Sequence, residues 1–390
     1  MLLFPPRENK YEPPSMSCFH ERRMPIGIGN TEIDRIIESV NGYLHDKTDD
    51  DLRISSYTRG YDVVQLVVET GDKEKSMMIR VMTDGVAAAA GVDRAMVRIA
   101  AENDRALIEV SNVLHGTVGM RALLMSDEFA RAPKFAVPIG AGCNYRDVYW
   151  DFAERNLCLV GGGENTRLPE FLRALAIAFA YKLPPDELKM IMIGTDNTFS
   201  AFDGTYPYNL SEPVTDREEG RYIMQWLEDE MTRRDACFEK AGCDDLFSYN
   251  ASAAVKSKRL PRLPHIITFV SELSDLVNAD NDLSQTVHDV WARGKYTGIS
   301  LLLATRRVTS GVPSFDLLAD ISDRIAFKFG DRFGSHKIAG SIDAVNLTSG
   351  SDALLKYGST SLVRFSSAYI DDEETTAAIA AIKERFANRS

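Results

Sequence analysis

A run of three glycines, residues 161–163, lies between a short apolar segment and an alanine-rich segment. The apolar residues 157–160 predict a strand, and residues 171–181 predict a helix that ends before two prolines. A glycine-rich turn between a strand and a helix is typical of a phosphate-binding loop, because glycines let backbone N–H groups point at an anion beside the helix N-terminus. The spacing therefore indicates an anion or nucleotide site in this turn.

The turn lacks the side chains that nucleotide hydrolysis needs. In the motif G-x-x-x-x-G-K-[ST], the lysine binds the β- and γ-phosphates and the hydroxyl binds Mg²⁺. Counted from Gly162, Arg167 replaces the second glycine, Leu168 the lysine and Pro169 the hydroxyl. Because arginine can chelate phosphate, Arg167 is the candidate substitute, and the alternative is a plain structural turn. The candidate residues of the loop are Gly161, Gly162, Gly163, Glu164, Asn165, Thr166, Arg167, Leu168 and Pro169.

A basic segment, VKSKRLPR, is the strongest candidate for contact with nucleic acid. Its cations are Lys256, Lys258, Arg259 and Arg262, and it contains no acid. Such a segment can contact backbone phosphates, although many basic loops are only solvated. The six histidines and five cysteines show no metal-site spacing, so we predict no metal site and free cysteines.

The first part of the chain predicts an arm followed by a small α+β domain. Residues 1–26 are rich in proline. From Thr31, a candidate N-cap, apolar residues follow helical spacing to about His45. Residues 63–69 and 75–81 are rich in β-forming residues and predict a hairpin-like pair of strands. The predicted divisions are a proline-rich arm at 1–26, the small domain at 27–150 and a larger domain at 151–390.

The second part of the chain alternates strands with helices. Almost wholly apolar runs, typical of parallel strands covered on both faces, occur at residues 158–160, 189–193, 266–270, 299–304 and 325–329. Thr215 and Glu218 predict a capping box for a long helix to Phe238. This alternation predicts a doubly wound, mostly parallel α/β sheet, in which ligands bind beyond the carboxyl ends of the strands.

Composition narrows the class of protein. A chain of 390 residues exceeds what one core usually supports. With 44% hydrophobic and 26% charged residues, and without an apolar run of about 18 residues, we expect a globular protein with no membrane span. The apolar segment at the start of the sequence is too short for a signal peptide, so we expect a cytoplasmic protein. The net charge of -12 argues against uniform coating of nucleic acid, but it does not exclude a local basic channel.

The order of these segments resembles the motor region of the FtsK/SpoIIIE family of hexameric DNA translocases. The resemblance extends from about Thr31 to Phe386 and includes SYTRGYDVVQLVVETG, LCLVGG, FAYKLPPDELKMIMI, PVTD, IITFVSELSDLV, TGISLLLATRR, DRIAFKFG and GSDALLKY. It implies a RecA-like P-loop NTPase domain after the small α+β domain, a ring of six subunits, double-stranded DNA in the central pore, and ATP with Mg²⁺ as cofactors.

The chain departs from the family pattern beyond the loop as well. The family's second motif ends in Asp-Glu, whereas here IITFVSE ends in Ser271 and Glu272. The resemblance therefore implies loss of the metal-side carboxylate and makes Glu272 the one candidate catalytic base, with a polar strand end as its alternative. After the next strand, the family has a polar sensor residue followed by an arginine; here Arg306 replaces the sensor and Arg307 is retained. We expect these two arginines either to reach the phosphate site of a neighbouring subunit or to form salt bridges at a subunit interface. Losing two or three charge-assisted contacts would weaken Mg·ATP binding by about two to six orders of magnitude.

These departures favour a silent ring subunit that does not hydrolyse ATP and needs no cofactor. It would assemble with itself or with an FtsK-like paralogue and act as a scaffold, a regulator or a module that binds cargo or DNA. Two alternatives stay open. The first is an active ATP-dependent translocase of double-stranded DNA with an altered ATP site, and the second is a degenerate ATPase module like those of type VII secretion, which bind protein substrates.

Overall fold

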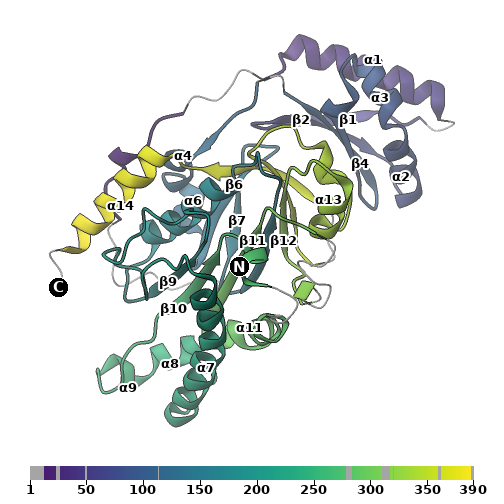
Figure 1. Cartoon of the computed structure of the whole chain (residues 1–390). Coiled ribbons are helices and arrows are strands. Elements are labelled where there is room, and N and C mark those ends of the chain that lie inside the picture. The colour runs from purple at the N-terminus through teal and green to yellow at the C-terminus, as the bar shows by residue number, and fades with distance from the viewer. Residues whose placement is uncertain are drawn as a thin grey trace.

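Two β-sheets, each packed against helices, organise the chain (Figure 1). The computed structural model describes residues 13–22, 27–48, 51–112, 114–277, 283–309, 317–318, 320–358 and 362–387. Much of the predicted arm, residues 1–12 and 23–26, lies outside these ranges. Within them, no helix is long and apolar enough to cross a bilayer.

The smaller sheet is antiparallel and has four strands in the order β1-β2-β4-β3. The strands are β1 (Ile54–Arg59), β2 (Val63–Glu69), β3 (Val97–Ala101) and β4 (Arg105–Ser111). The helices packed with them are α1 (Asn30–Lys47), α2 (Lys73–Val81) and α3 (Thr83–Ala90), with the 3₁₀ turn η2 (Arg94–Met96) before β3. Alternate residues of β2, such as Leu66 and Val68, share one apolar core with Ile33 and Ile36 of α1.

Two predictions for this region are wrong. Residues 75–81 form part of helix α2 and not a strand, because Asp72 caps the helix by accepting a hydrogen bond from the Lys75 N–H at 2.8 Å. The strands that pair with β2 are β1 and β4. Helix α1 has Gly29 as its N-cap, so Thr31 lies in the first turn.

The larger sheet has ten strands, in the order β7-β6-β14-β13-β12-β8-β11-β10-β9, with β5 (Val118–Gly119) paired to β14. Its parallel strands are β8 (Leu157–Gly161), β9 (Leu188–Ile193), β10 (His265–Val270), β11 (Ile299–Thr305) and β12 (Arg324–Phe327). Its antiparallel strands are β6 (Ala136–Gly142), β7 (Asp147–Asp151), β13 (Asp352–Lys356) and β14 (Val363–Tyr369). The predicted α/β class is confirmed, but the sheet is mixed because the chain adds an antiparallel half to the parallel one.

Helices cover both faces of the larger sheet, which explains the apolar strands. One core contains α6 (Leu168–Lys182), α14 (Asp372–Ala387), α4 (Met120–Leu124) and α5 (Asp127–Arg131). The other contains α7 (Arg217–Ala241), α10 (Leu273–Leu276), α11 (Ser284–Thr297) and α13 (Arg332–Ala339). In β8, Cys158 and Val160 lie in the first core while Leu157 and Leu159 lie in the second. The N-cap of α7 is Asp216 and not Thr215, because the Asp216 side chain accepts the Glu219 N–H.

The far end of α7 carries a projecting lobe. The lobe consists of this end of α7 with α8 (Leu246–Ala251) and α9 (Ala253–Lys256), and it extends away from the sheet in Figure 1. It has its own small core around Phe238 and Tyr249.

The sheets also bear on the predicted division of the chain. Strands β6 and β7 precede residue 151 but belong to the larger sheet. Sheet membership therefore favours a division soon after β4, and the boundaries at residues 26 and 150 stay predictions.

Candidate functional site

The loop between β8 and α6 lines an open cleft of about 540 Å³ at the carboxyl ends of the parallel strands. Glu164, Asn165 and Thr166 form one wall of this cleft, as the sequence predicts for ligand-facing residues. Arg306 contributes from the loop after β11. The remaining walls come from residues 328–331 and 348–350.

Backbone N–H groups of the glycine loop donate to carbonyls of the protein itself. The bonds run from Gly162 to Thr305 at 3.2 Å, from Gly163 to Lys328 at 2.8 Å, and from Arg167 to Gly350 at 2.9 Å. In a working phosphate loop such groups point at the anion. Here these three N–H groups already have acceptors.

The side chains that follow the loop also lie away from the cleft. Leu168, in the position of the phosphate-binding lysine, is only 1% exposed and belongs to the core around α6. Pro169 occupies the first turn of α6. The guanidinium carbon of Arg167 lies 4.3 Å from the centre of the Tyr369 ring, and its Nη1 lies 3.4 Å from Thr117 Oγ1. Arg167 therefore packs on β14, which favours the alternative of a structural turn.

Glu272, the candidate catalytic base, is buried, and both of its carboxylate oxygens accept hydrogen bonds. One carboxylate oxygen accepts hydrogen bonds from Thr305 Oγ1 at 2.6 Å and from Ser274 Oγ at 2.7 Å. The other accepts the Arg306 N–H at 3.1 Å and lies 3.7 Å from Arg307 Nε. These contacts fix Glu272 at the start of α10, where it is also the N-cap.

Two further carboxylates lie beside Glu272, and each is paired with arginine. Asp196 Oδ1 accepts Ser271 Oγ at 2.6 Å, and Arg306 Nη2 donates to Asp196 Oδ2 at 2.7 Å. Burial raises the pKa of Asp196, but the hydrogen bonds from Ser271 and Thr198 and the charge of Arg306 outweigh this effect and lower the pKa below its usual value.

Asp275 is the second of these carboxylates. It accepts hydrogen bonds from Arg307 and from Arg217, the latter at 3.2 Å. Three acids, Asp196, Glu272 and Asp275, thus lie among three arginines, Arg217, Arg306 and Arg307. Arginine provides the positive charge that a metal ion would otherwise bring to such carboxylates.

Sequence reasoning missed Asp196, Asp275 and Arg217. The available signal for Asp196 was its place three residues after the apolar strand KMIMI, at the edge of the sheet that also holds Gly162 and Glu272. Arg217 comes to the site from the first turn of α7. Only the packing of α7 beside α10 brings it to Asp275.

The basic segment lies on the projecting lobe, away from the cleft. Lys256, Lys258 and Arg259 are exposed at α9 and just beyond it. Among the described residues, Arg262 alone of the four cations pairs with an acid, Glu187, at 3.1 Å. The candidate DNA-contacting residues and the cleft are therefore separate features.

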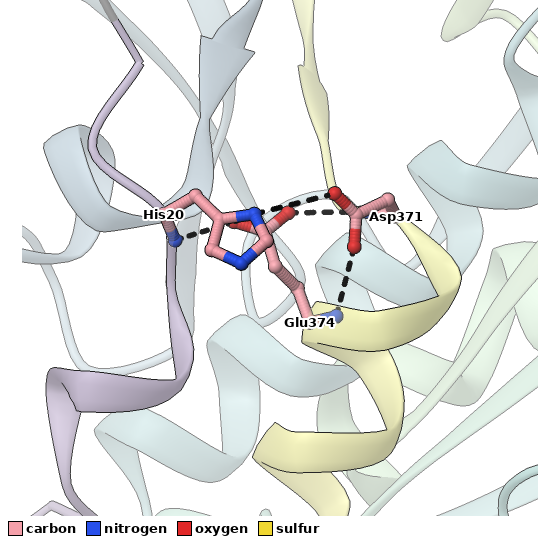
Figure 2. Close-up of side chains that lie close together, drawn as sticks. All are labelled: His20, Asp371 and Glu374. Atoms are coloured by element: carbon pink, nitrogen blue, oxygen red, sulfur yellow. Dashed lines mark hydrogen bonds and ion pairs between the residues drawn. The ribbon is translucent and has the colours of Figure 1, made fainter.

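One group of metal-ligand types occurs elsewhere among the described residues. His20, Asp371 and Glu374 place their ligand atoms within 4.8 Å of one another (Figure 2). Arg22 Nη2 already bonds both carboxylates, at 2.8 Å to Asp371 and 2.5 Å to Glu374. The other oxygens accept the N–H groups of Glu374 and His20, so the carboxylates are satisfied without a metal.

Comparison with solved structures supports the class of fold. The chain superposes on the cytoplasmic domain of the Thermomonospora curvata type VII secretion ATPase EccC with a TM-score of 0.59 and 23% identity, covering 68% of this chain and 34% of that one. It superposes on the pCW3 conjugation coupling protein TcpA, solved as a monomer with ATPγS, with a TM-score of 0.59 and 15% identity, covering 90% of this chain and 100% of that one. At these identities the likeness shows the fold alone, which is that of P-loop ATPases.

Sequence comparison finds similarity to one protein family. The FtsK/SpoIIIE family model matches residues 120–310. The chain is 26% identical over 283 residues to the DNA translocase SftA of Bacillus subtilis, covering 72% of this chain and 30% of that protein. It is 25% identical over 405 residues to DNA translocase FtsK 1 of Neisseria meningitidis, covering 98% of this chain and 50% of that protein. The predicted resemblance to the FtsK/SpoIIIE family is confirmed. The chain spans half or less of the length of these two relatives.

Proposed function

We propose that this chain is a catalytically inactive member of the FtsK/SpoIIIE family. It keeps the architecture of the motor but neither binds Mg·ATP tightly nor hydrolyses it. It acts as a ring subunit with itself or with an FtsK-like paralogue, and its role is that of a scaffold or regulator. The observation that carries this proposal is the state of the glycine loop. Its Gly163 and Arg167 N–H groups are bonded to protein carbonyls, and its lysine position is a buried leucine.

The residues present do not fit a bound Mg·ATP. Phosphate would have to displace the Lys328 and Gly350 carbonyls, and no lysine would compensate for their loss. A magnesium ion would find Ser271 in place of a carboxylate and would compete with Arg306 for Asp196. The carboxylate network is neutral without a metal, so the protein gains little from binding one.

Calorimetry and a turnover assay with Mg·ATP on the purified chain test this proposal. We expect no binding in the micromolar range and no phosphate release above the buffer blank. Micromolar affinity or steady turnover would overturn the proposal.

A variant with Leu168→Lys and Pro169→Ser distinguishes the effect of the missing side chains from that of the bonded backbone N–H groups. We expect it to stay silent, because the loop N–H groups still donate to the Lys328 and Gly350 carbonyls. Tight Mg·ATP binding by this variant alone would mean that the two side chains, and not the loop backbone, explain the silence of the native chain.

A second candidate function is contact with double-stranded DNA through the projecting lobe. It is supported by the exposed cations Lys256, Lys258 and Arg259, and by relatives named as DNA translocases. These cations lie on a lobe that extends from the sheet, where they can reach a phosphate backbone.

Fluorescence anisotropy with a labelled duplex at several salt concentrations tests the lobe. Replacing Lys256, Lys258 and Arg259 with glutamate should weaken binding and lower the slope of log affinity against log salt by about 2 to 3. Arg262→Ala is the matched control, because Glu187 already holds that cation. Equal binding by the triple variant and the native chain would exclude the lobe as a DNA contact.

A further inference from the structure

Residues 348–350 line one wall of the cleft. They belong to the segment 348–351, which connects η3 (Asp343–Asn346) to β13. Its Gly350 carbonyl accepts the Arg167 N–H at 2.9 Å. Gly350 also lies so close to the glycine loop that a Cβ atom there would be 3.0 Å from the Asn165 carbonyl oxygen. The segment therefore packs directly on the glycine loop.

The smaller sheet holds the other side of the same segment. Thr348 Oγ1 donates to Ser111 Oγ at 3.1 Å, and Ser111 is the last residue of β4. Ser349 Oγ donates to Asp62 Oδ1 at 3.3 Å, and Asp62 lies in the turn between β1 and β2. Both acceptors are 2% exposed, so water has little access to these contacts.

A buried arginine fixes the geometry behind the segment. Arg364 of β14 bonds Asp352 through Nε at 2.9 Å, and it lies 3.3 Å from Glu109 of β4. Its Nη2 also lies 3.3 Å from Ser111 Oγ and 3.4 Å from Thr348 Oγ1. The two sheets and the segment thus share one network of charged and hydroxyl groups.

We propose that segment 348–351 is an internal gate that couples the smaller sheet to the glycine loop. Asp62 and Ser111 hold the segment, and the segment holds the Gly350 carbonyl against the Arg167 N–H. A shift of the smaller sheet against the larger one moves this carbonyl and exposes the N–H group. The inference rests on the proposed function, since it concerns the same closed loop, but it does not depend on whether ATP is turned over.

Hydrogen exchange resolved to single amides tests the gate in the full chain. The double variant Thr348→Val with Ser349→Ala removes both hydroxyl contacts to the smaller sheet. We expect exchange of the Arg167 amide to quicken by about tenfold or more. The Gly163 amide, which is bonded to the Lys328 carbonyl, should keep its native rate and serves as the internal control.

Two further variants sharpen the result. Asp62→Asn weakens the gate from the side of the smaller sheet and should give the same selective change at Arg167. Thr297→Val removes a buried hydroxyl of α11, which donates to the Arg293 carbonyl at 3.0 Å, and should leave the Arg167 rate unchanged. An unchanged Arg167 rate in the double variant overturns the inference, and so does equal acceleration at Gly163 and Arg167. ATP turnover by the native chain would instead count against the proposed function alone.

Discussion

At the scale of single residues, the contacts of Glu272 bear on whether its role is structural or catalytic. Its two oxygens accept bonds from Thr305, Ser274 and the Arg306 N–H, and the side chain is 3% exposed. A general base must keep an oxygen open to its substrate or water. The low exposure and these contacts favour the structural alternative, in which Glu272 ties β10 to β11.

We expect Glu272→Gln to lower the free energy of unfolding by about 1 to 3 kcal/mol, because the new amide group presents a donor to groups that donate. Chemical denaturation measures this change. Glu164→Gln, at an exposed site in the cleft, is the control and should stay within about 0.5 kcal/mol of the native chain. An unaltered stability in Glu272→Gln would contradict the structural role.

His265 gives the chain a dependence on pH. Burial lowers the pKa of the His265 imidazole to about 3, and the charge of Arg234 acts in the same direction. Its usual value is about 6.5. Between these two values the unfolded chain binds a proton that the folded chain does not, so stability rises with pH across this window and the benefit is complete above it.

We expect this histidine to add about 1.4 kcal/mol per pH unit to the slope of stability against pH below about 6.5. Denaturation curves of the native chain and of His265→Gln, collected from pH 7 down to the lowest pH at which the protein stays folded, measure the difference in slope. Parallel curves for the native chain and His265→Gln would contradict the prediction.

At the scale of elements, β6 shows what joins the antiparallel half of the larger sheet. Gly140 has a φ of 154°, and a Cβ atom there would collide with the carbonyl oxygen of Ser366 in β14. The pairing of β6 with β7 is also irregular between Pro138 and Gly140. Only glycine allows the two backbones to approach this closely.

We expect Gly140→Ala to cost about 2 to 4 kcal/mol of stability, because it adds both a backbone strain and a collision. Gly42→Ala is the matched control: it lies in α1 with open space around it and should stabilise the protein by about 0.5 to 1 kcal/mol. Thermal unfolding of the two variants should therefore shift in opposite directions. A neutral Gly140→Ala would show that β6 and β14 can separate without cost.

At the scale of the whole molecule, the two sheets are joined by buried charge. Arg364 of the larger sheet is 3% exposed and contacts both Asp352 and Glu109, and Glu109 of the smaller sheet also bonds Arg98 at 2.7 Å. Burial disfavours the charged guanidinium, but Asp352 and Glu109 outweigh it and raise the pKa of Arg364. Arg98 and Arg364 likewise outweigh burial and lower the pKa of Glu109, whereas burial raises the pKa of Asp352 in spite of Arg364.

We expect Arg364→Met to lower stability by about 3 to 5 kcal/mol, because it leaves Asp352 and Glu109 without their shared cation. Arg35→Met breaks an exposed pair with Glu32, which water and salt screen, and should cost far less stability. Limited proteolysis alongside denaturation would show whether the smaller sheet is released first. Equal losses in the two variants would mean that the buried network contributes no more than a surface pair.

Much of the fold could be predicted because it depends on local pattern. The apolar runs that became β8, β9, β10 and β11 needed no partner to be recognised, since a strand covered on both faces must be apolar throughout. The same local reasoning failed for residues 75–81. There β-forming residues follow a capping aspartate, and the cap with its first turn outweighed the propensity of the later residues.

The sequence by itself determined the apolar parallel strands and the helices between them, the family resemblance, and the absence of lysine and hydroxyl groups after the glycine turn. Only the tertiary structure decided that Arg167 packs on Tyr369, that the Lys328 and Gly350 carbonyls take the loop N–H groups, and that arginines neutralise Asp196, Glu272 and Asp275. The physical reason is distance along the chain. Periodicity and turn chemistry act between neighbours, whereas the partner of a hydrogen bond or a charge is chosen by residues far away in the sequence that meet only when the sheets are packed.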